Sequence, residues 1–414
     1  MATENNNKTL NVPNLRFPEF SGEWDRIKVS DLLEFYPTNS LSWSQLEYSE
    51  EGVLNLHYGL IHKGLPTQVD VFENSLPIIK EEFIPKKISL CLNGDVAFAD
   101  ASEDTNDVAK CIEFANCDGK KIVCGLHTIH GRDTQNKTVT GYKGYAFSAQ
   151  AFREQIRRLA QGTKIYSINS GNFSECYIGI PSKVEQSKIA NLLLAVDQRL
   201  AAQIKIIEDL KKLKSAISKQ IFVQKPICWN RLETLFIKGK AGGTPTSTNK
   251  DYYNGEIPFL SINDITKQGK YIRYTENHLS QSGLDNSSAW VVPAHSLIMS
   301  MYASVGLVTI NEIPIATSQA MFAMQLKDKG LLDYLYYYLS YFKYRHIHKY
   351  LETGTQSNIN ADIVRGIMIP DYGHEHNIEI ASTLQSIDAK IDNELSVLEQ
   401  FNKQKNYLLS QMFI

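Results

Sequence analysis

The stretch LLAVDQRLAAQIKIIEDL at residues 193–210 has a near copy, LQSIDAKIDNELSVLEQF, at residues 384–401. Apolar residues recur in both stretches in alternating steps of three and four. This is the heptad pattern of helices that pair along a hydrophobic seam. Two long and similar helices, 191 residues apart in the chain, are therefore the feature from which the fold is predicted.

The seam extends beyond the quoted stretches, and eight of its ten positions are apolar in each segment. These apolar positions are Ile189, Leu193, Val196, Leu200, Ile207, Leu210, Ile217 and Ile221 in the first segment, and Ile380, Leu384, Ile387, Ile391, Leu398, Phe401, Leu408 and Met412 in the second. The polar exceptions also coincide, Gln203 with Glu394 and Lys214 with Lys405. A polar residue in a seam fixes the register of pairing. The pattern therefore favours pairing of the two segments over two ordinary amphipathic helices in separate domains.

The repeat continues upstream of each helix. WDRI at 24–27 resembles WNRL at 229–232, and AQGTKIYSIN at 160–169 resembles ETGTQSNIN at 352–360. The intervening residues share little text, and they contain short β-rich runs with some helix between them. We therefore predict an α+β fold with a pseudo-two-fold internal repeat, in which two α/β globular domains are separated by two long helices that pair as an antiparallel coiled coil. The expected segments are a globular domain at 1–179, a helix at 180–225, a globular domain at 226–369 and a helix at 370–414.

A helix of this length would measure about 60 Å at 1.5 Å per residue. With one globular domain at each end of the antiparallel pair, the helices would hold two binding modules a fixed distance apart. Double-helical DNA presents successive major-groove faces about 34 Å apart on one side. Two modules on such a spacer could therefore reach separate patches of one duplex.

Composition indicates a globular protein of two or three domains, with 414 residues of which 43% are hydrophobic. The longest mostly apolar run, at 296–310, is too short and too rich in Ser and Thr to span a bilayer, and the start of the chain lacks a secretory pattern. The cysteines form no C-x-x-C pair, so we expect reduced thiols and a cytoplasmic location. Cys111, Cys117, Cys124 and His127 fit no structural zinc spacing, and we expect no metal site.

The formal net charge of -2 argues against a nucleic-acid partner, but the charges are unevenly distributed. Nine Lys or Arg residues lie between Lys120 and Lys164, against Asp133 and Glu154. This predicts a basic face in the first domain. Its candidates for contact with phosphate are Arg132, Lys137 and Lys143.

Several loops carry side chains that can contact phosphate or base edges. The run GKAGGTPTSTNKDYYNG at 239–255 combines small hydroxyl and amide side chains with glycines that permit close approach. GLHT at 125–128 and ATSQ at 316–319 are similar, although surface loops use such residues widely. The tyrosines of the predicted helix at 333–351 could stack on bases, but tyrosines at helical spacing are more often part of a core.

The alternation of globular domain and repeated helix, together with several short phrases in both halves, resembles the specificity subunits of type I restriction-modification systems. The second half carries GGTPTSTNKDYYNGEIPFLSINDI, MSMYASVG, ATSQA, GTQSNIN and HNIEIASTLQSIDAKI, and the first half carries NVPNLRFPEFSGEW, FADASED, GLHTI and GTKIYSIN. The resemblance covers nearly the whole chain. It implies two target recognition domains, each reading one half of a bipartite sequence in double-stranded DNA, joined by an antiparallel helical spacer. Leu307 stands where related sequences often have Lys, which removes one expected phosphate contact.

The resemblance also implies where DNA is read. The candidate residues lie in loops that match the family phrases: Asp100, Ser102, His127 and Thr128 in the first domain, and Thr244, Thr246, Tyr252, Tyr253, Tyr302, Ser318 and Gln319 in the second.

The chain is expected to be a non-catalytic reader of DNA. It has no Asn/Asp-Pro-Pro-aromatic loop for methyl transfer to a base amino group and no G-x-x-x-x-G-K-[ST] phosphate loop. By the resemblance, S-adenosylmethionine, ATP and Mg²⁺ would be bound by partner subunits, namely two methyltransferase subunits and the restriction and translocase subunits. The alternative is a coiled-coil scaffold for protein interactions without DNA recognition.

Overall fold

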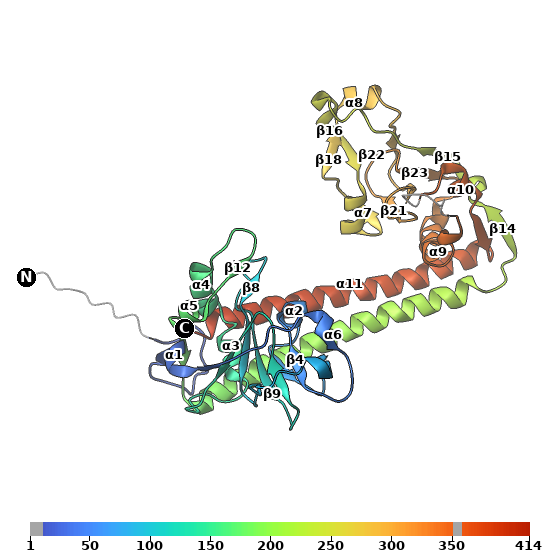
Figure 1. Ribbon diagram of the computed structural model, residues 1–414. Coiled ribbons are helices and arrows are strands. Elements are labelled where there is room, and N and C mark those ends of the chain that lie inside the picture. Colours follow the sequence, from blue (N-terminus) through green and yellow to red (C-terminus); the bar gives the residue numbers. More distant parts are fainter. Residues whose placement is uncertain (1–10, 351–357) are drawn as a thin grey trace, which may run out of the picture. The chain divides into compact units, whose positions relative to one another are not determined.

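The computed structural model describes residues 11–350 and 358–414 (Figure 1). The phrase GTQSNIN at 354–360 therefore lies mostly outside the described residues. The chain divides into two compact units, the first formed by Met1–Lys205 with Ser396–Ile414 and the second by Ile206–Leu395. Each unit contains mixed sheets and one half of each long helix, which confirms the predicted α+β class.

The first unit contains a five-stranded sheet with the order β2-β11-β7-β9-β5 and a four-stranded sheet with the order β10-β4-β6-β3. Their strands are β2 (Glu34–Tyr36), β3 (Leu46–Glu47), β4 (Leu54–Leu56), β5 (Gln68–Asp70), β6 (Ile78–Ile79), β7 (Val96–Ala99), β9 (Cys111–Asn116), β10 (Ile122–Cys124) and β11 (Thr128–Arg132). Two ribbons join β1 (Asp25–Lys28) to β13 (Tyr177–Ile180) and β8 (Ala101–Ser102) to β12 (Tyr166–Ser167). The α-helices are α1 (Val29–Leu32), α2 (Tyr58–Lys63), α3 (Tyr142–Ala146), α4 (Gln150–Leu159) and α5 (Ser170–Ser174).

The second unit has a five-stranded sheet with the order β15-β23-β20-β21-β17 and a four-stranded sheet with the order β18-β16-β22-β19. The strands are β15 (Phe236–Ala241), β16 (Tyr253–Leu260), β17 (Tyr271–Ile272), β18 (Asn277–Leu279), β19 (Val291–Val292), β20 (Leu297–Ser300), β21 (Val308–Asn311), β22 (Ile315–Thr317) and β23 (Met321–Leu326), with a separate ribbon of β14 (Cys228–Arg231) and β24 (Met368–Asp371). The α-helices are α7 (Ile262–Gln268), α8 (Gln281–Asp285), α9 (Leu332–Arg345) and α10 (Ala361–Gly366).

The two units share a topology that the sequence similarity does not reveal. When the strands of each five-stranded sheet are numbered along the chain, both sheets have the same spatial order. The pair at one edge is parallel, β5 with β9 in the first unit and β17 with β21 in the second, and the other pairs are antiparallel. The two-stranded ribbons β1–β13 and β14–β24 also have the same register. Asp25 pairs with Ile180 in the first, and the equivalent residues Asn230 and Ile369 pair in the second. The four-stranded sheets differ, since β3 lies beside β6 in the first unit whereas β19 lies beside β22 in the second.

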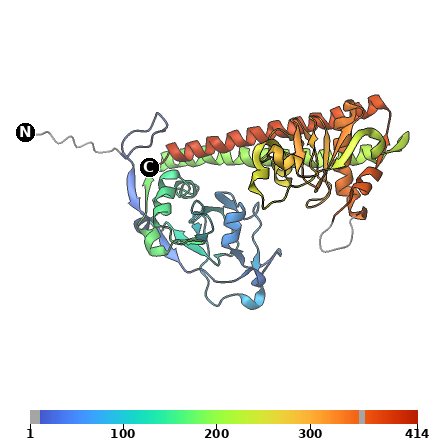
Figure 2. The same cartoon turned by 90° about the horizontal axis from the view of Figure 1, so that it is seen from above.

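The long helices are α6 (Lys183–Phe222) and α11 (His374–Gln411), which lie within the predicted helical segments (Figure 2). In the first unit Ile189, Leu193, Val196 and Leu200 share a buried cluster with Leu408 and Met412, and Leu398 and Phe401 pack against it. In the second unit Ile380 and Leu384 share a buried cluster, against which Ile217, Ile221 and Ile387 pack. Of the remaining seam residues, Ile207 and Ile391 are buried and Leu210 is half-buried.

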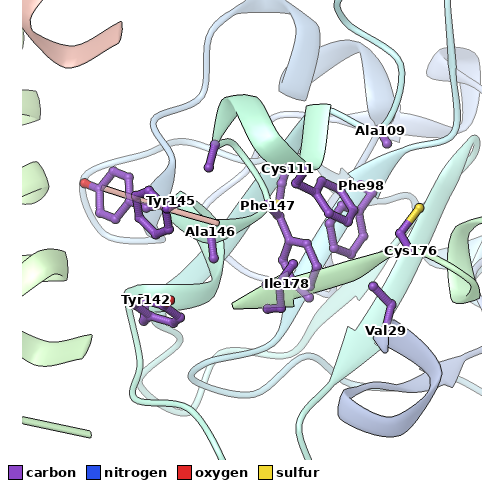
Figure 3. Close-up of a cluster of buried hydrophobic side chains, with 14 of the residues drawn as sticks. Val29, Phe98, Ala109, Cys111, Tyr142, Tyr145, Ala146, Phe147, Cys176 and Ile178 are labelled. Atoms are coloured by element: carbon purple, nitrogen blue, oxygen red, sulfur yellow. The ribbon is translucent and has the colours of Figure 1, made fainter. Parts of the chain in front are cut away.

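The core of the first unit lies between its five-stranded sheet and the helices. Figure 3 shows its aromatic centre, where Phe98 of β7 meets Phe147, with Tyr142 and Tyr145 of α3 nearby. Phe98 and Phe147 contact edge to face, with ring centroids 4.9 Å apart. In the second unit Tyr334, Tyr337 and Tyr338 of α9 are buried, so these tyrosines belong to the core, as their helical spacing favoured. Among the described residues, no helix combines the length and apolar character needed to cross a bilayer.

Candidate nucleic-acid interface

In the second unit, the glycine-rich loop after β15 packs against the turn between β22 and β23. The Gly243 N–H donates to the Thr317 carbonyl at 2.9 Å, and a Cβ on Gly242 would lie 1.9 Å from that same oxygen. Only glycine permits such an approach. This close approach of the loop to the turn brings Thr244, on the loop, next to Gln319, on the turn. The Thr244 hydroxyl donates to the Gln319 side-chain oxygen.

Of the other predicted residues of this unit, Ser318 lies on the same turn, whereas Thr246, Tyr252 and Tyr253 lie on the loop after β15 and at its end. The Tyr253 hydroxyl donates to the Pro245 carbonyl at 2.8 Å, and Thr246 is exposed one residue further along the loop. Tyr252, in the turn before β16, is half-buried, and its carbonyl accepts from the Ser280 N–H at 3.0 Å. Ser318 accepts from the Ala320 N–H with its hydroxyl at 3.3 Å.

The loop between β20 and β21 adds Tyr302 to this group. The Met301 N–H donates to the Ala320 carbonyl at 2.7 Å, so the loop is joined to the turn that carries Gln319. Tyr302 is 41% exposed and precedes Ala303 and Ser304, which have φ values of 40° and 52°. Non-glycine residues rarely adopt this conformation. The second unit therefore presents one patch of hydroxyl, amide and phenol groups; these are side chains that can hydrogen-bond to base edges and phosphates.

In the first unit, Asp100 and His127 lie side by side. The His127 Nδ1 is 3.1 Å from an Asp100 carboxylate oxygen, and the Asp100 N–H donates to the His127 carbonyl at 3.1 Å. His127 has a φ of 55°, and its side chain is 49% exposed. Thr128 differs from the prediction, because it is buried and its hydroxyl donates to the Gly125 carbonyl at 2.5 Å. Thr128 therefore stabilises the turn that presents His127.

His127 and Ser102 line a cleft of about 530 Å³ whose wall is aromatic. The rings of Trp43 and His57 have centroids 4.5 Å apart, and Tyr58 follows at 4.7 Å from His57 and 5.2 Å from His127. Burial, with the neighbouring His127 and Lys63, lowers the pKa of His57, whose Nδ1 accepts from the Gly59 N–H at 3.1 Å. The His57 ring is therefore neutral and, with Trp43 and Tyr58, forms an aromatic surface on which nucleic-acid bases could stack.

The rim of the cleft is acidic. Its lining includes the carboxylates of Glu103, Asp104 and Asp107, together with His62 and Lys63. Carboxylates accept hydrogen bonds from base amino groups but repel phosphate. Sequence reasoning missed Trp43, His57, Tyr58 and His62, because their spacing forms no motif and they meet Ser102 and His127 only through folding.

Two of the three predicted phosphate contacts, Arg132 and Lys143, form ion pairs inside the first unit. The Arg132 Nε and Nη2 contact the two Asp95 carboxylate oxygens at 2.8 and 2.7 Å. The Lys137 ammonium donates to the Asp31 carbonyl at 3.1 Å. Lys143 is 3% exposed and forms an ion pair with Glu113 at 3.2 Å, so the expectation that its ammonium contacts phosphate does not fit its position. In the second unit Leu307 packs against an apolar cluster.

Comparison with known proteins points to one family. Residues 229–402 match the model of the type I restriction modification DNA specificity domain. The chain is 26% identical over 178 residues to the type I restriction enzyme MjaIX specificity subunit of Methanocaldococcus jannaschii, covering 42% of this chain and 40% of that protein. It is 24% identical over 355 residues to the putative type I restriction enzyme MjaX specificity subunit of the same organism, covering 80% of each. The first of these alignments thus spans less than half of the relative.

Two solved structures share the fold. The S subunit of a type I restriction-modification system from M. genitalium has a TM-score of 0.55 at 15% identity, covering 97% of this chain and 99% of that one. A chain from a study of complex assembly and conformational transition of the type I R-M system has a TM-score of 0.61 at 15% identity, covering 93% and 96%. The second half of the chain therefore matches the type I restriction modification DNA specificity domain, and the chain as a whole is similar in sequence to a putative type I specificity subunit and in fold to solved structures from type I systems.

Proposed function

We propose that this chain selects the DNA target of a type I restriction-modification complex, with each unit reading one half of a bipartite sequence. The observation that carries the proposal is the recurrence of one sheet topology with different loops in the two units. A shared framework with divergent loops is what two readers of different sequences need, because the framework sets position and the loops set specificity. The patch around Gln319 and the cleft beside His127 are the proposed reading surfaces.

We further propose that the chain catalyses no reaction itself and that its partners supply the chemistry. Methyltransferase subunits would bind S-adenosylmethionine, and restriction and translocase subunits would bind ATP and Mg²⁺. The internal repeat supports two methyltransferase subunits, because it offers two similar surfaces. Ile204 and Leu395 occupy equivalent positions of the repeat and are 47% and 42% exposed, which suits two equivalent contacts.

A domain exchange tests the proposal. Residues 1–179 are replaced by those of a related subunit, and methylated bases are mapped across the genome of cells that also contain the methyltransferase partner. We expect a change in one half of the methylated sequence only. The matched control replaces residues 226–369 and should change the other half. If both halves change in either exchange, or neither does, the modular proposal is wrong. An unchanged pattern in both exchanges would favour a protein scaffold instead.

A further inference from the structure

Three metal-ligating side chains meet in the interior of the first unit. Cys91, Cys124 and His130 are 2%, 1% and 0% exposed. One ligand atom from each lies within 4.8 Å of the other two, and the two sulfur atoms are 3.6 Å apart. The sequence predicted no metal site. Of the residues considered and rejected there, Cys111 belongs to another buried cluster and His127 lines the exposed cleft.

The geometry points to a zinc site formed by Cys91, Cys124 and His130, and we propose it as such. Two thiolates bound to one tetrahedral zinc at about 2.3 Å lie about 3.8 Å apart, close to the separation found here. Two sulfurs and one imidazole are ligands that zinc prefers. Binding would displace the two thiol protons. Cys117 is buried in the same apolar cluster as Cys91 and Cys124, but its sulfur does not lie within 4.8 Å of all three ligand atoms, so the proposed site has three protein ligands.

The imidazole of His130 carries the second, independent observation. Its Nε2 lies 2.8 Å from an Asp95 carboxylate oxygen, and its Nδ1 is buried without a hydrogen bond of standard geometry among the described residues. The other polar group that interacts with the ring is the thiol of Cys91, itself one of the three candidate ligands. A buried polar atom without a well-placed partner is costly. A metal at Nδ1 would satisfy it, and the carboxylate at the other nitrogen is the usual support of a zinc-bound histidine.

Asp95 is itself firmly held. It accepts from the Arg132 guanidinium and from the Leu92 N–H, the latter at 2.9 Å. The proposed site is therefore supported by a fixed carboxylate, as preorganised metal sites are. Asp95 is a positioning residue in this proposal, because it would act on the metal through His130.

The site would hold together the two sheets of the first unit. Cys124 ends β10 of the four-stranded sheet, His130 lies in β11 of the five-stranded sheet, and the Cys91 N–H donates to the Ile122 carbonyl of β10 at 2.8 Å. Between Cys124 and His130 runs the turn that presents His127. Zinc would thus fix both ends of a proposed reading loop. This consequence rests on the proposed function, whereas the metal content does not.

Zinc analysis of the purified full chain tests the site. Protein prepared in zinc-supplemented medium under reducing conditions should contain about one zinc per chain. Cys91→Ser and Cys124→Ser should each lower the content about tenfold, and Asp95→Asn should weaken zinc affinity roughly 10–100-fold. Cys111→Ser is the matched control, because Cys111 is equally buried but lies in the other cluster, and it should retain the metal.

Cobalt keeps the proposal testable if the serine variants do not fold. The wild-type chain, freed of zinc and given Co²⁺ alone, should show a thiolate-to-cobalt charge-transfer band. Zinc below about one tenth per chain together with no such band, a disulfide between Cys91 and Cys124 in protein purified under reducing conditions, or equal loss in Cys111→Ser would each overturn the site. If zinc binds but its removal alters discrimination at neither half of the DNA target, the metal site stands and its proposed effect on reading fails.

Discussion

Lys405 of α11 forms an ion pair with Asp197 of α6 at 2.5 Å, and the second oxygen of Asp197 accepts from the Tyr145 hydroxyl at 2.9 Å. The second unit repeats this arrangement. Lys214 pairs with Asp388 at 2.5 Å, and the Tyr337 hydroxyl donates to the other Asp388 oxygen at 2.8 Å. Tyr145 and Tyr337 come from the globular parts, on α3 and α9. Each set of three residues therefore joins the globular part of a unit to both of its long helices, and the repeat persists at the level of single contacts.

Asp197→Ala should destabilise the first unit. Burial and the neighbouring Asp197 carboxylate raise the pKa of Tyr145, so its phenol remains protonated and would lose its acceptor, as would the ammonium of Lys405. We expect the free energy of unfolding to fall by about 2 kcal/mol, measured by urea denaturation. Asp209→Ala is the control, because its pair with Lys212 is largely exposed, and the change should be below about 0.5 kcal/mol. Equal losses in the two variants would contradict this role.

Lys143→Met should affect stability and leave the DNA contact unchanged. Burial raises the pKa of Glu113, although Lys143 and the Gly144 N–H oppose this shift. Removal of Lys143 leaves the buried Glu113 carboxyl without its cation. We expect a loss of about 3–5 kcal/mol in the free energy of unfolding. Combining Lys143→Met with Glu113→Leu should recover much of the loss.

The salt dependence of DNA binding separates this role from a phosphate contact. Lys143→Met in its folded form should leave the slope of log affinity against log salt unchanged. A phosphate contact would instead lower that slope by about 0.9. If Lys143→Met lowers this salt slope and leaves the free energy of unfolding unchanged, Lys143 contacts phosphate and does not act as the buried partner of Glu113.

Asp371→Asn should reveal a pH-dependent contribution at the start of α11. Burial alone would raise the pKa of Asp371, but hydrogen bonds from the Gly373 N–H and from Asn377 and Asn230 hold it below its usual value. A carboxyl group whose pKa is lower in the folded than in the unfolded state stabilises the folded protein. This contribution is fully present above the unfolded-state pKa of about 3.9 and is lost as the pH falls through the folded-state pKa.

We therefore expect the wild-type chain to exceed Asp371→Asn by about 1 kcal/mol near neutral pH, with allowance for the partial exposure of the carboxylate. The difference should shrink as the pH falls below about 4. Unfolding curves of both proteins over this range provide the measurement. A difference that stays constant with pH would contradict the assignment.

Gln319→Ala should weaken discrimination in one half of the target. Gln319 is exposed and held by Thr244, so its amide is positioned to contact a base edge. We expect a loss of about 1–3 kcal/mol of discrimination at one base pair, measured by binding of the assembled complex to duplexes with single substitutions. Gln385→Ala, at an exposed position on α11, is the control and should leave discrimination unchanged. A uniform loss at both halves would mean that Gln319 does not read sequence.

The helices could be predicted because their signal is local. Seam residues such as Leu193 and Leu384 recur at a period that the sequence displays directly, and both are fully buried. The common sheet topology could not be predicted, because it depends on pairs far apart in the chain, such as Gln68 with Glu113. The loops on this framework share little sequence, so the similarity of the two sheets becomes visible only in the strand order.

The candidate site was predictable where glycine and hydroxyl residues mark a loop, as at Thr244. It was not predictable where folding brings distant residues together. Lys143 looked like a surface cation because Glu113, its partner, lies outside the basic run. Cys91, Cys124 and His130 follow no metal-binding spacing, and they meet because β10 and β11 belong to adjoining sheets.

We propose that α6 and α11 set the distance between two DNA readers, and shortening both helices is the sharpest experiment on this spacing. Removing residues 205–211 and 396–402 takes one heptad from each helix at equivalent positions of the repeat, keeps the seam in phase and retains Ile204 and Leu395. Each helix shortens by about 10 Å. In cells that contain the methyltransferase partner, mapping of methylated sites should show both half-sequences unchanged and the unread gap shorter by about three base pairs, at 3.4 Å per base pair. A gap of unchanged length in a folded, active complex would contradict the account.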